Sequence, residues 1–323
     1  MWKVLIKSHD KKKSEDFTEK IGEIEWSDST DQLGAEFSFK TLFSKWDENY
    51  NKTIAPGSLF LLYNDSTLWF QGVITETPIN GGGYKGYDLS WYLNQSTTII
   101  QFKKIRADKA IKQLCSKFGV PVGSISSMKT TIKKVYKDET PADIINDILD
   151  KVQDETDTKH RIEMKNGKLY ITKLKRIEIK PTYTDELGET VPCVNAAEIT
   201  GQKSIEKLRN YVQYATKKEK SKGIKATARS SASIKKYGLL STVYTKDKLT
   251  PAKARQYAKN KLKSLNKVEI TFSCKMPGSA SIRPGRWIEF PDTGIGISGW
   301  YKVKSCTHKM IGDKYFVELE MSN

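Results

Sequence analysis

The sequence predicts a mainly β protein with an α+β module in its middle and two related small β-barrels in each chain. Three observations predict this fold class. Polar and apolar residues alternate with period two at Glu36–Lys40, and further short strand candidates occur near both ends of the chain. Between the ends, apolar residues recur with helical spacing over residues 107–118. A Pro-Gly turn, a strand, an aromatic pair and a second turn follow one another twice, starting at Pro56 and at Pro284.

Residues 1–98 are expected to form the first barrel. Five short apolar or alternating runs are separated by turn sequences, such as Ala-Pro-Gly at 55–57 and Asn-Gly-Gly-Gly at 80–83. Short strands with regular turns are typical of a small barrel or sandwich. The candidate strands are Trp2–Ile6, Glu36–Lys40, Leu59–Tyr63, Leu68–Ile74 and Tyr84–Leu93.

In residues 99–174 the apolar pattern changes to helical spacing, and we expect this segment to form an α+β module. The first helix presents one apolar face, made of Ala107, Ala110, Ile111, Leu114, Cys115 and Phe118. The second helix starts after Thr140, a good capping residue, with Pro141 at the first helical position. Its apolar face is Ile144, Ile145, Ile148, Leu149 and Val152. Asn-Gly at 166–167 lies between two alternating runs and predicts a β-hairpin.

Residues 175–323 are expected to form the second barrel, with one helix and a long basic loop. The stretch from Lys217 to Tyr237 is rich in Lys, Ser and Ala, which is typical of an exposed loop. A helix is predicted from Pro251 to Leu265, with Thr250 as its cap. The strands that close the chain are predicted at Val268–Cys274, Arg286–Phe290, Trp300–Lys304 and Tyr315–Met321.

Composition excludes several classes of protein. No apolar run reaches the roughly 18 residues of a membrane helix. The apolar stretch after Met1 is short for a signal peptide, so we expect synthesis in the cytoplasm. The four cysteines are far apart in sequence and form no Cys-x-x-Cys signature, which favours buried free thiols.

The net charge of +17 is unevenly spread. Residues 1–98 carry −4, residues 99–174 carry +6 and residues 175–323 carry +15. Only 6 of the 29 basic residues in the last segment are Arg, the residue that favours specific phosphate and base contacts. This favours a solvated surface or an acidic protein partner over nucleic acid. The candidate partner-binding residues are Lys217, Lys218, Lys220, Lys222 and Lys225.

Catalytic signals are missing from the sequence. The three histidines, His9, His160 and His308, are scattered, and no serine lies in a Gly-x-Ser-x-Gly elbow. Cys306 and His308 would share one face of a strand, but two ligands do not make a metal site. We therefore expect no enzymatic activity, no catalytic residue, no metal and no cofactor. Carboxylate pairs of glycoside hydrolases are set by the fold, so a hydrolase stays an alternative.

Motifs of the C-terminal half resemble the baseplate hub proteins of contractile phage tails, of the PBSX-prophage type. The motifs are Asn210-Tyr211-Val212, Ser233–Gly238, the Ala-rich helix Ala252–Leu265, Arg283-Pro284-Gly285, Gly299–Val303, Cys306-Thr307-His308 and Val317-Glu318-Leu319. The stretch Phe70–Ile74, with Tyr87–Leu89 and Tyr92-Leu93, is similar to the first barrel of that family. The resemblance covers nearly the whole chain, and the order of the motifs carries it.

The resemblance implies a structural homotrimer. Each subunit would contribute two tail-tube-like barrels to a ring of six, which faces the sixfold tail tube and carries a threefold spike. The implied partners are the tube protein, the spike protein and other baseplate proteins, with non-specific passage of DNA through the lumen and no membrane insertion. The implied location is the baseplate of a virion or of a phage-tail-like bacteriocin. The alternatives are a cell-wall hydrolase of a tail and a nucleic-acid-binding protein that uses the basic C-terminal half.

Overall fold

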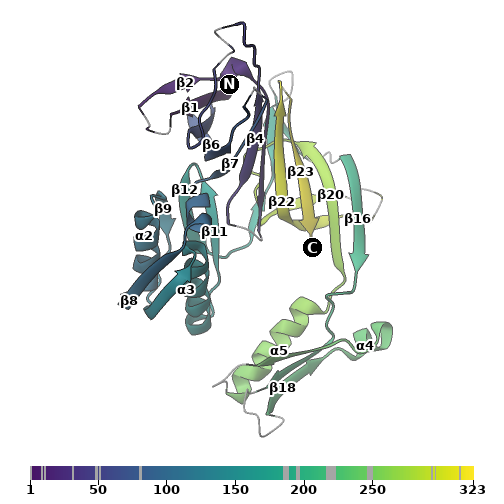
Figure 1. The fold of residues 1–323 in the computed structure, drawn as a ribbon. Helices are drawn as coiled ribbons and strands as arrows, with labels where there is room; N and C mark the ends of the chain where they lie inside the picture. The colour runs from purple at the N-terminus through teal and green to yellow at the C-terminus, as the bar shows by residue number, and fades with distance from the viewer. Residues whose placement is uncertain are drawn as a thin grey trace. The chain divides into compact units, whose positions relative to one another are not determined.

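The computed structural model describes residues 2–8, 10, 12–30, 33–47, 50, 52–79, 82–184, 189–193, 197–215, 223–245, 250–291, 294, 296–312 and 314–323. The chain forms two compact units (Figure 1). The first unit contains Met1–Glu198 and Cys274–Met321, and the second contains Ile199–Ser273 and Ser322–Asn323. Within the described residues, no helix has the length and apolarity needed to cross a membrane. The division into residues 1–98, 99–174 and 175–323 stays a prediction.

The N-terminal part of the first unit is a sheet whose neighbouring strands follow the order β3-β4-β7-β6-β5-β1-β2. Its elements are β1 (Trp2–Lys7), β2 (Ser14–Asp16), the 3-10 turn η1 (Thr18–Lys20), β3 (Ile21–Ser29), β4 (Glu36–Thr41), β5 (Leu59–Asn64), β6 (Thr67–Glu76) and β7 (Gly83–Asp88). The five predicted strands are therefore present, and β2 and β3 are additional ones. The prediction of a strand through Leu93 is wrong, because β7 ends at Asp88 and α1 (Trp91–Gln95) follows.

Aromatic side chains fill the core of this sheet. The Phe37 ring lies 4.8 Å from the Phe60 ring, and the Phe39 ring lies 4.8 Å from the Tyr84 ring. Phe37 also covers Gly86, its partner on the neighbouring strand, where an added Cβ would come within 2.6 Å of the ring. The large rings and the glycine thus form one close-packed cross-strand arrangement.

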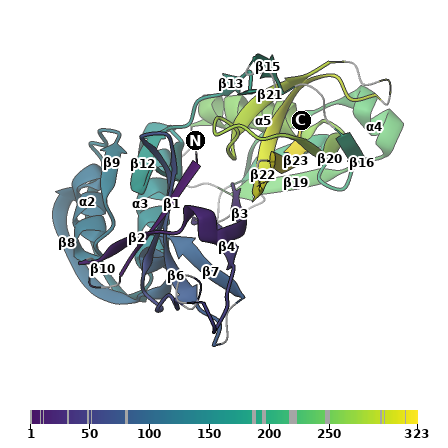
Figure 2. The same cartoon turned by 90° about the horizontal axis from the view of Figure 1, so that it is seen from above.

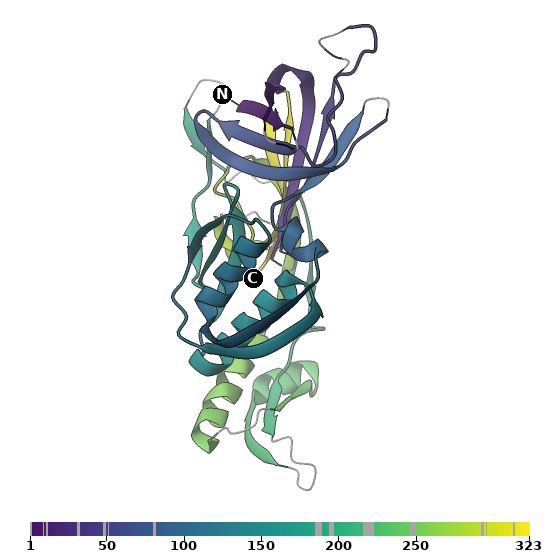
Figure 3. The ribbon, with the colours of Figure 1, turned by 60° about the vertical axis from the view of Figure 1, so that its left-hand side comes forward.

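The middle of the chain forms helices and strands as predicted. Its elements are β8 (Thr98–Arg106), α2 (Ala107–Lys117), β9 (Val122–Ile125), β10 (Thr131–Glu139), α3 (Pro141–Thr156), β11 (His160–Lys165) and β12 (Lys168–Lys173). The helices α2 and α3 lie side by side against β8 and β10 (Figure 2, Figure 3). The Thr140 side chain accepts a hydrogen bond from the Asp143 backbone N–H, which confirms the predicted cap. Asn166 and Gly167 have φ of 51° and 70°, as a two-residue hairpin loop requires.

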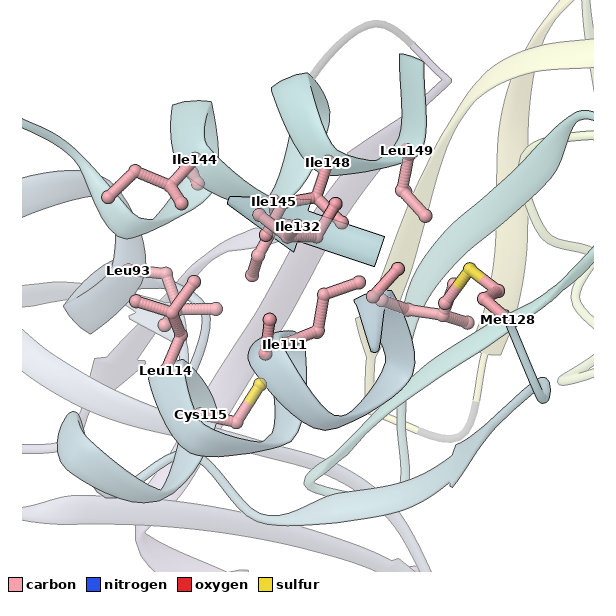
Figure 4. Close-up of a cluster of buried hydrophobic side chains, with 14 of the residues drawn as sticks. Leu93, Ile111, Leu114, Cys115, Met128, Ile132, Ile144, Ile145, Ile148 and Leu149 are labelled. Atoms are coloured by element: carbon pink, nitrogen blue, oxygen red, sulfur yellow. The ribbon is translucent and has the colours of Figure 1, made fainter. Parts of the chain in front are cut away.

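The predicted faces of α2 and α3 form one buried core (Figure 4). Ile111 and Leu114 of α2 point toward Ile144, Ile145 and Ile148 of α3, and all five are fully buried. Phe118, the last residue of the predicted first face, is partly buried against the same cluster. The helix faces are therefore confirmed.

The C-terminal strands of the first unit continue the sheet. Outside the second unit, the elements after the hairpin are β13 (Ile177–Ile179), β14 (Thr182–Thr184), β15 (Thr190–Pro192), β16 (Ala197–Ser204), β20 (Glu269–Pro277), β21 (Arg286–Phe290), β22 (Gly299–Ile311) and β23 (Lys314–Ser322), of which β16 and β20 extend across the boundary into the second unit. The neighbour order is β20-β23-β22, with β21 paired to β22 and β13 to β21. Residues 305–311 of β22 also pair with β3. Through the described residues the two halves form one sheet that does not close on itself, so the two barrels stay a prediction.

The second unit contains a three-stranded sheet with one helix packed on it (Figure 1). Its elements are β17 (Tyr211–Ala215), β18 (Ile224–Arg229), α4 (Ser231–Tyr237), β19 (Ser241–Thr245) and α5 (Pro251–Leu265). Ala254 and Ala258 of α5 pack against Val212, Tyr214 and Ala226. The predicted helix and its Thr250 cap are confirmed.

The prediction of a loop from 217 to 237 is wrong for its second half. Residues 224–229 form β18, which pairs with β17, and residues 231–237 form α4. The segment lacks large apolar residues because small ones suffice here: Ala226 and Ala228 face the alanines of α5. Alanine at a closely packed helix–sheet contact gives no amphipathic signal in the sequence.

Candidate functional site

An arginine-rich turn joins the C-terminal strands to the β11–β12 hairpin. The turn spans residues 283–286 and ends at the first residue of β21. Arg283 Nη1 donates to the Met164 carbonyl at 2.9 Å, and Arg161 Nη2 of the hairpin donates back to the Gly285 carbonyl at 3.0 Å. Gly285 has φ of 77°, a conformation that favours glycine. We call residues 161–164 and 283–286 the arginine junction.

The centre of the arginine junction is a mostly buried ion pair. Arg286 Nη1 and Nη2 donate to Glu163 Oε2 and Oε1 at 2.6 and 3.1 Å, and the side chains are only 10% and 20% exposed. Burial is the largest single influence and raises the pKa of Glu163, but the Arg286 hydrogen bonds and the charges of Arg286, Arg283 and Arg161 together hold that pKa below its ordinary value. A bidentate pair of this kind fixes both distance and orientation. The pair therefore fixes the position of the β11–β12 hairpin relative to the start of β21.

Two carboxylates lie beside the junction, the half-buried Asp28 and the buried Asp88. Asp28 of β3 and Asp88 of β7 line a cavity of about 320 Å³ together with Arg283 and Trp26. Burial, and then the Asp88 charge, raises the pKa of Asp28 to about 6, although Arg283 opposes the shift. Asp88 accepts hydrogen bonds from the backbone N–H groups of Ala35 and Ser90 at 2.8 and 2.9 Å. It thereby ties the start of β4 to the entry of α1.

The predicted Cys306–His308 pair lies on the inner face of β22. His308 is stacked on Trp26 with ring centroids 4.7 Å apart, and its Nδ1 and Nε2 lie 2.8 Å from the Tyr315 hydroxyl and 3.2 Å from the Ile282 carbonyl. Burial, and then the Arg283 charge, lowers the pKa of His308 to about 3. Both ring nitrogens are engaged, and the ring is neutral at physiological pH. This arrangement packs the interior and offers no general base.

The remaining candidate residues from the sequence do not gather into one site among the residues that the structure describes. His160 lies on β11, and His9 lies outside the described residues. Among the residues with described positions, no three His, Cys, Asp or Glu side chains gather as a metal site would require. All four cysteines are buried free thiols, as predicted. Of the candidate partner-binding lysines, Lys225 lies in β18, while Lys217, Lys218, Lys220 and Lys222 lie outside the described residues.

The two Pro-Gly turns occupy matching places in two similar strand arrangements. The order β4-β7-β6-β5 near the N-terminus has the counterpart β20-β23-β22-β21 near the C-terminus, with the strands in the same chain order. Gly57 and Gly285 have φ of 83° and 77°. Their N–H groups donate to the carbonyls of Ile74 and Val303 at 2.8 and 2.7 Å.

The β5–β6 and β21–β22 hairpins have the same strand register next to their Pro-Gly turns. Leu59, three positions after Pro56, pairs with Val73, and Trp287, three positions after Pro284, pairs with Lys302. In each hairpin the glycine N–H donates to the carbonyl of the residue that follows this partner. The aromatic pairs do not correspond, because Trp300 lies two positions further along its strand than Trp69. A shift of two keeps each side chain on the same face. Phe70 and Tyr301 are accordingly both buried.

Sequence reasoning missed the arginine junction as a site. Its partners Glu163 and Arg286 are 123 residues apart in sequence, so no local pattern joins them. One signal was available: two of the six arginines after residue 174 occur within one four-residue turn of a lysine-rich chain. Arginine in such a position indicates a planar, bidentate contact.

Comparison with known proteins identifies relatives along nearly the whole chain. A sequence profile of the YQBQ-like family matches residues 24–322. The uncharacterized protein YqbQ of Bacillus subtilis is 28% identical over 244 residues, covering 71% of this chain and 72% of the relative. The phage-like element PBSX protein XkdQ of the same organism is 25% identical over 289 residues, covering 87% and 86%.

Solved structures share the fold at low sequence identity. The 43 kDa tail protein of prophage MuSo2 from Shewanella oneidensis matches with a TM-score of 0.70 at 12% identity, covering 99% of this chain and 97% of that one. The tail protein from Neisseria meningitidis MC58 matches with a TM-score of 0.64 at 12% identity, covering 100% and 96%. Prophage tail protein gp18 from Listeria monocytogenes matches with 0.64 at 11% identity, covering 99% and 94%.

Proposed function

The chain belongs to the YQBQ-like family, and on this premise we propose that it is the structural hub of a phage-tail baseplate. A relative from the phage-like element PBSX aligns with 87% of the chain, and three tail proteins share its fold across almost their full length. These similarities support a tail or baseplate protein. The hub role within that class needs a further argument.

The observation that carries the hub role is the duplicated strand order within one chain. The arrangement β4-β7-β6-β5 and its counterpart β20-β23-β22-β21 share their order, their Pro-Gly turn and the register at that turn. A chain with two similar halves offers two similar surfaces. Three such chains offer six, which is the number that a sixfold tube end requires, while the assembly itself keeps the threefold symmetry of a spike.

In this proposal the two halves are two related barrels, completed in a homotrimer. The tube protein lies on one side of the ring and the spike protein on the other, with other baseplate proteins around it and a lumen through which DNA can pass. The residue 99–174 module lies outside the ring, and the arginine junction holds its hairpin against β21 of the second repeat. A bidentate, mostly buried pair suits a joint that must not shift under load.

The proposed role is structural rather than enzymatic, and the proposed location is the baseplate of a virion or phage-tail-like particle. Both buried histidine nitrogens of His308 are engaged, and the Cys306 thiol beside it has a pKa raised by burial. A buried thiol with a raised pKa is a poor nucleophile. Lys217, Lys218, Lys220, Lys222 and Lys225 stay candidate contacts to an acidic partner.

The test is the stoichiometry of the assembled protein. The chain would be co-expressed with the tube and spike proteins from its own source, and the mass of the purified complex would be measured by native mass spectrometry. We expect the number of copies of this chain to be three or a multiple of three. A complex that contains one, two or four copies would overturn the hub role, while leaving membership of the family untouched.

A further inference from the structure

Almost all of the excess positive charge belongs to the second unit. Residues 199–273 and 322–323 contain 19 basic and 4 acidic residues, a net charge of +15, while the rest of the chain carries +2. The unit has its own small core beneath α5, made of Val212, Tyr214, Ala226, Ala254 and Ala258. We propose that this unit binds nucleic acid through the phosphate backbone, without reading its sequence.

Helix α5 presents the clearest basic surface of the unit. Arg255, Lys259 and Lys263 are spaced four residues apart, and all three are exposed, whereas Ala254 and Ala258 are buried. Four residues of helix rise about 6 Å, so the three charges form one straight row. Like charges at this spacing destabilise a helix slightly. The helix contains no Asp or Glu to offset them.

The row is open to a partner. Within the described part of the second unit, Lys207 pairs with Glu269 at 3.1 Å, whereas no acidic side chain pairs with Arg255, Lys259 or Lys263. Exposed cations without intramolecular partners keep their full attraction for an external anion. Repulsion along the row would be relieved when such an anion binds.

The composition of the unit favours nucleic acid over an acidic protein surface. Lysine is depleted in protein–protein interfaces, whereas interfaces with nucleic acid are much more positively charged. The unit has 16 Lys and 3 Arg, and lysine acts on phosphates as a point charge rather than as a fork for base edges. This combination indicates sequence-independent contact with the backbone. Nucleic acid thereby takes the place of the acidic protein partner that the low arginine content of residues 175–323 favours, and the inference does not require the hub role.

The experiment is a fluorescence anisotropy titration of the full chain. The probes are two labelled duplexes of about 20 base pairs with unrelated sequences, at several salt concentrations between about 50 and 200 mM. We expect equal affinity for both duplexes and a linear fall of log affinity with log salt. The variant Arg255→Gln/Lys259→Gln/Lys263→Gln should lose roughly tenfold or more in affinity, and its salt slope should fall by about 2.7.

The matched control removes three charges elsewhere. Lys109→Gln/Lys112→Gln/Lys133→Gln changes three exposed lysines of the first unit and gives the same net charge. This control should bind like the wild type, and both variants should melt at or slightly above the wild-type temperature. Equal losses in both variants would show a general charge effect and overturn the proposal. So would a preference for one duplex, or binding of a labelled poly-glutamate peptide as tight as that of DNA.

Discussion

Arg286 donates hydrogen bonds to both carboxylate oxygens of Glu163, from Nη1 to Oε2 at 2.6 Å and from Nη2 to Oε1 at 3.1 Å, although the two residues are 123 positions apart in sequence. The pair is mostly buried, so the desolvation cost of each charge is offset mainly by the charge of its partner.

Glu163→Gln should destabilise the first unit by about 3–5 kcal/mol, because it leaves the Arg286 charge buried without its partner. Chemical denaturation followed by tryptophan fluorescence measures the change. Replacing both partners, as in Glu163→Gln/Arg286→Met, should recover part of the loss. The matched control is Lys304→Gln, which breaks a more exposed pair with Glu320 and should have little effect. Equal effects of Glu163→Gln and Lys304→Gln would show that the Arg286–Glu163 pair does not stabilise the first unit.

Asp28 should make the first unit less stable as the pH rises. Its folded pKa of about 6 lies above the ordinary 3.8, so the folded state holds its proton more tightly than the unfolded state does. With respect to this group, stability is highest below about pH 4 and falls until about pH 6, by about 3 kcal/mol in total. Asp28→Asn should therefore be more stable than the wild type at pH 7 and similar at pH 4. Denaturation midpoints of both proteins across this range give the difference, and a constant difference would refute the assignment.

The shared core of α2 and α3 predicts large losses on truncation. Ile145 is fully buried and Leu149 is 9% exposed in this cluster, so Ile145→Ala or Leu149→Ala should cost about 2–5 kcal/mol. Ile99→Ala is a suitable control, because Ile99 is 72% exposed on β8. Thermal melting compares the three variants. Wild-type melting of both core variants would show that this cluster does not support the fold.

Purified protein should release no soluble fragments from peptidoglycan. The expectation rests on the engaged nitrogens of His308 and the buried thiols, which leave no activated nucleophile there. Dye-release from labelled cell walls measures the activity, with lysozyme as the positive control. Release that disappears on changing one Asp or Glu would instead establish the hydrolase alternative.

Local patterns in the sequence were sufficient for the elements of the middle segment. The α3 face, its Thr140 cap and the Asn-Gly hairpin depend on residues within one turn or one loop of each other, and all three were predicted correctly. The end of β7 was placed five residues too late. The Asp88 side chain, which accepts the Ser90 N–H, stops the strand there, and aromatic residues in α1 imitate a strand pattern.

Features that depend on distant residues could not be predicted in the same way. The arginine junction needs residues 161–164 and 283–286 together, and the pairing of β22 with β3 joins opposite ends of the chain. The concentration of positive charge in one unit depends on distant residues in the same way. Counting over 175–323 averaged the strongly basic second unit with the nearly neutral strands around it, because the unit boundaries near 199 and 273 are visible only in the fold.

The pairing of β3 with β22 also has a consequence for biosynthesis. Residues 23–29 of β3 receive their partners at 305–311 only after about 280 further residues have been made. At roughly 5–20 residues per second, the ribosome needs about 15–60 s to supply them. During that interval one edge of the newly made sheet is unpaired, and unpaired edges recruit other strands. The nascent chain therefore passes through a period of aggregation risk that ends when its last hairpin emerges.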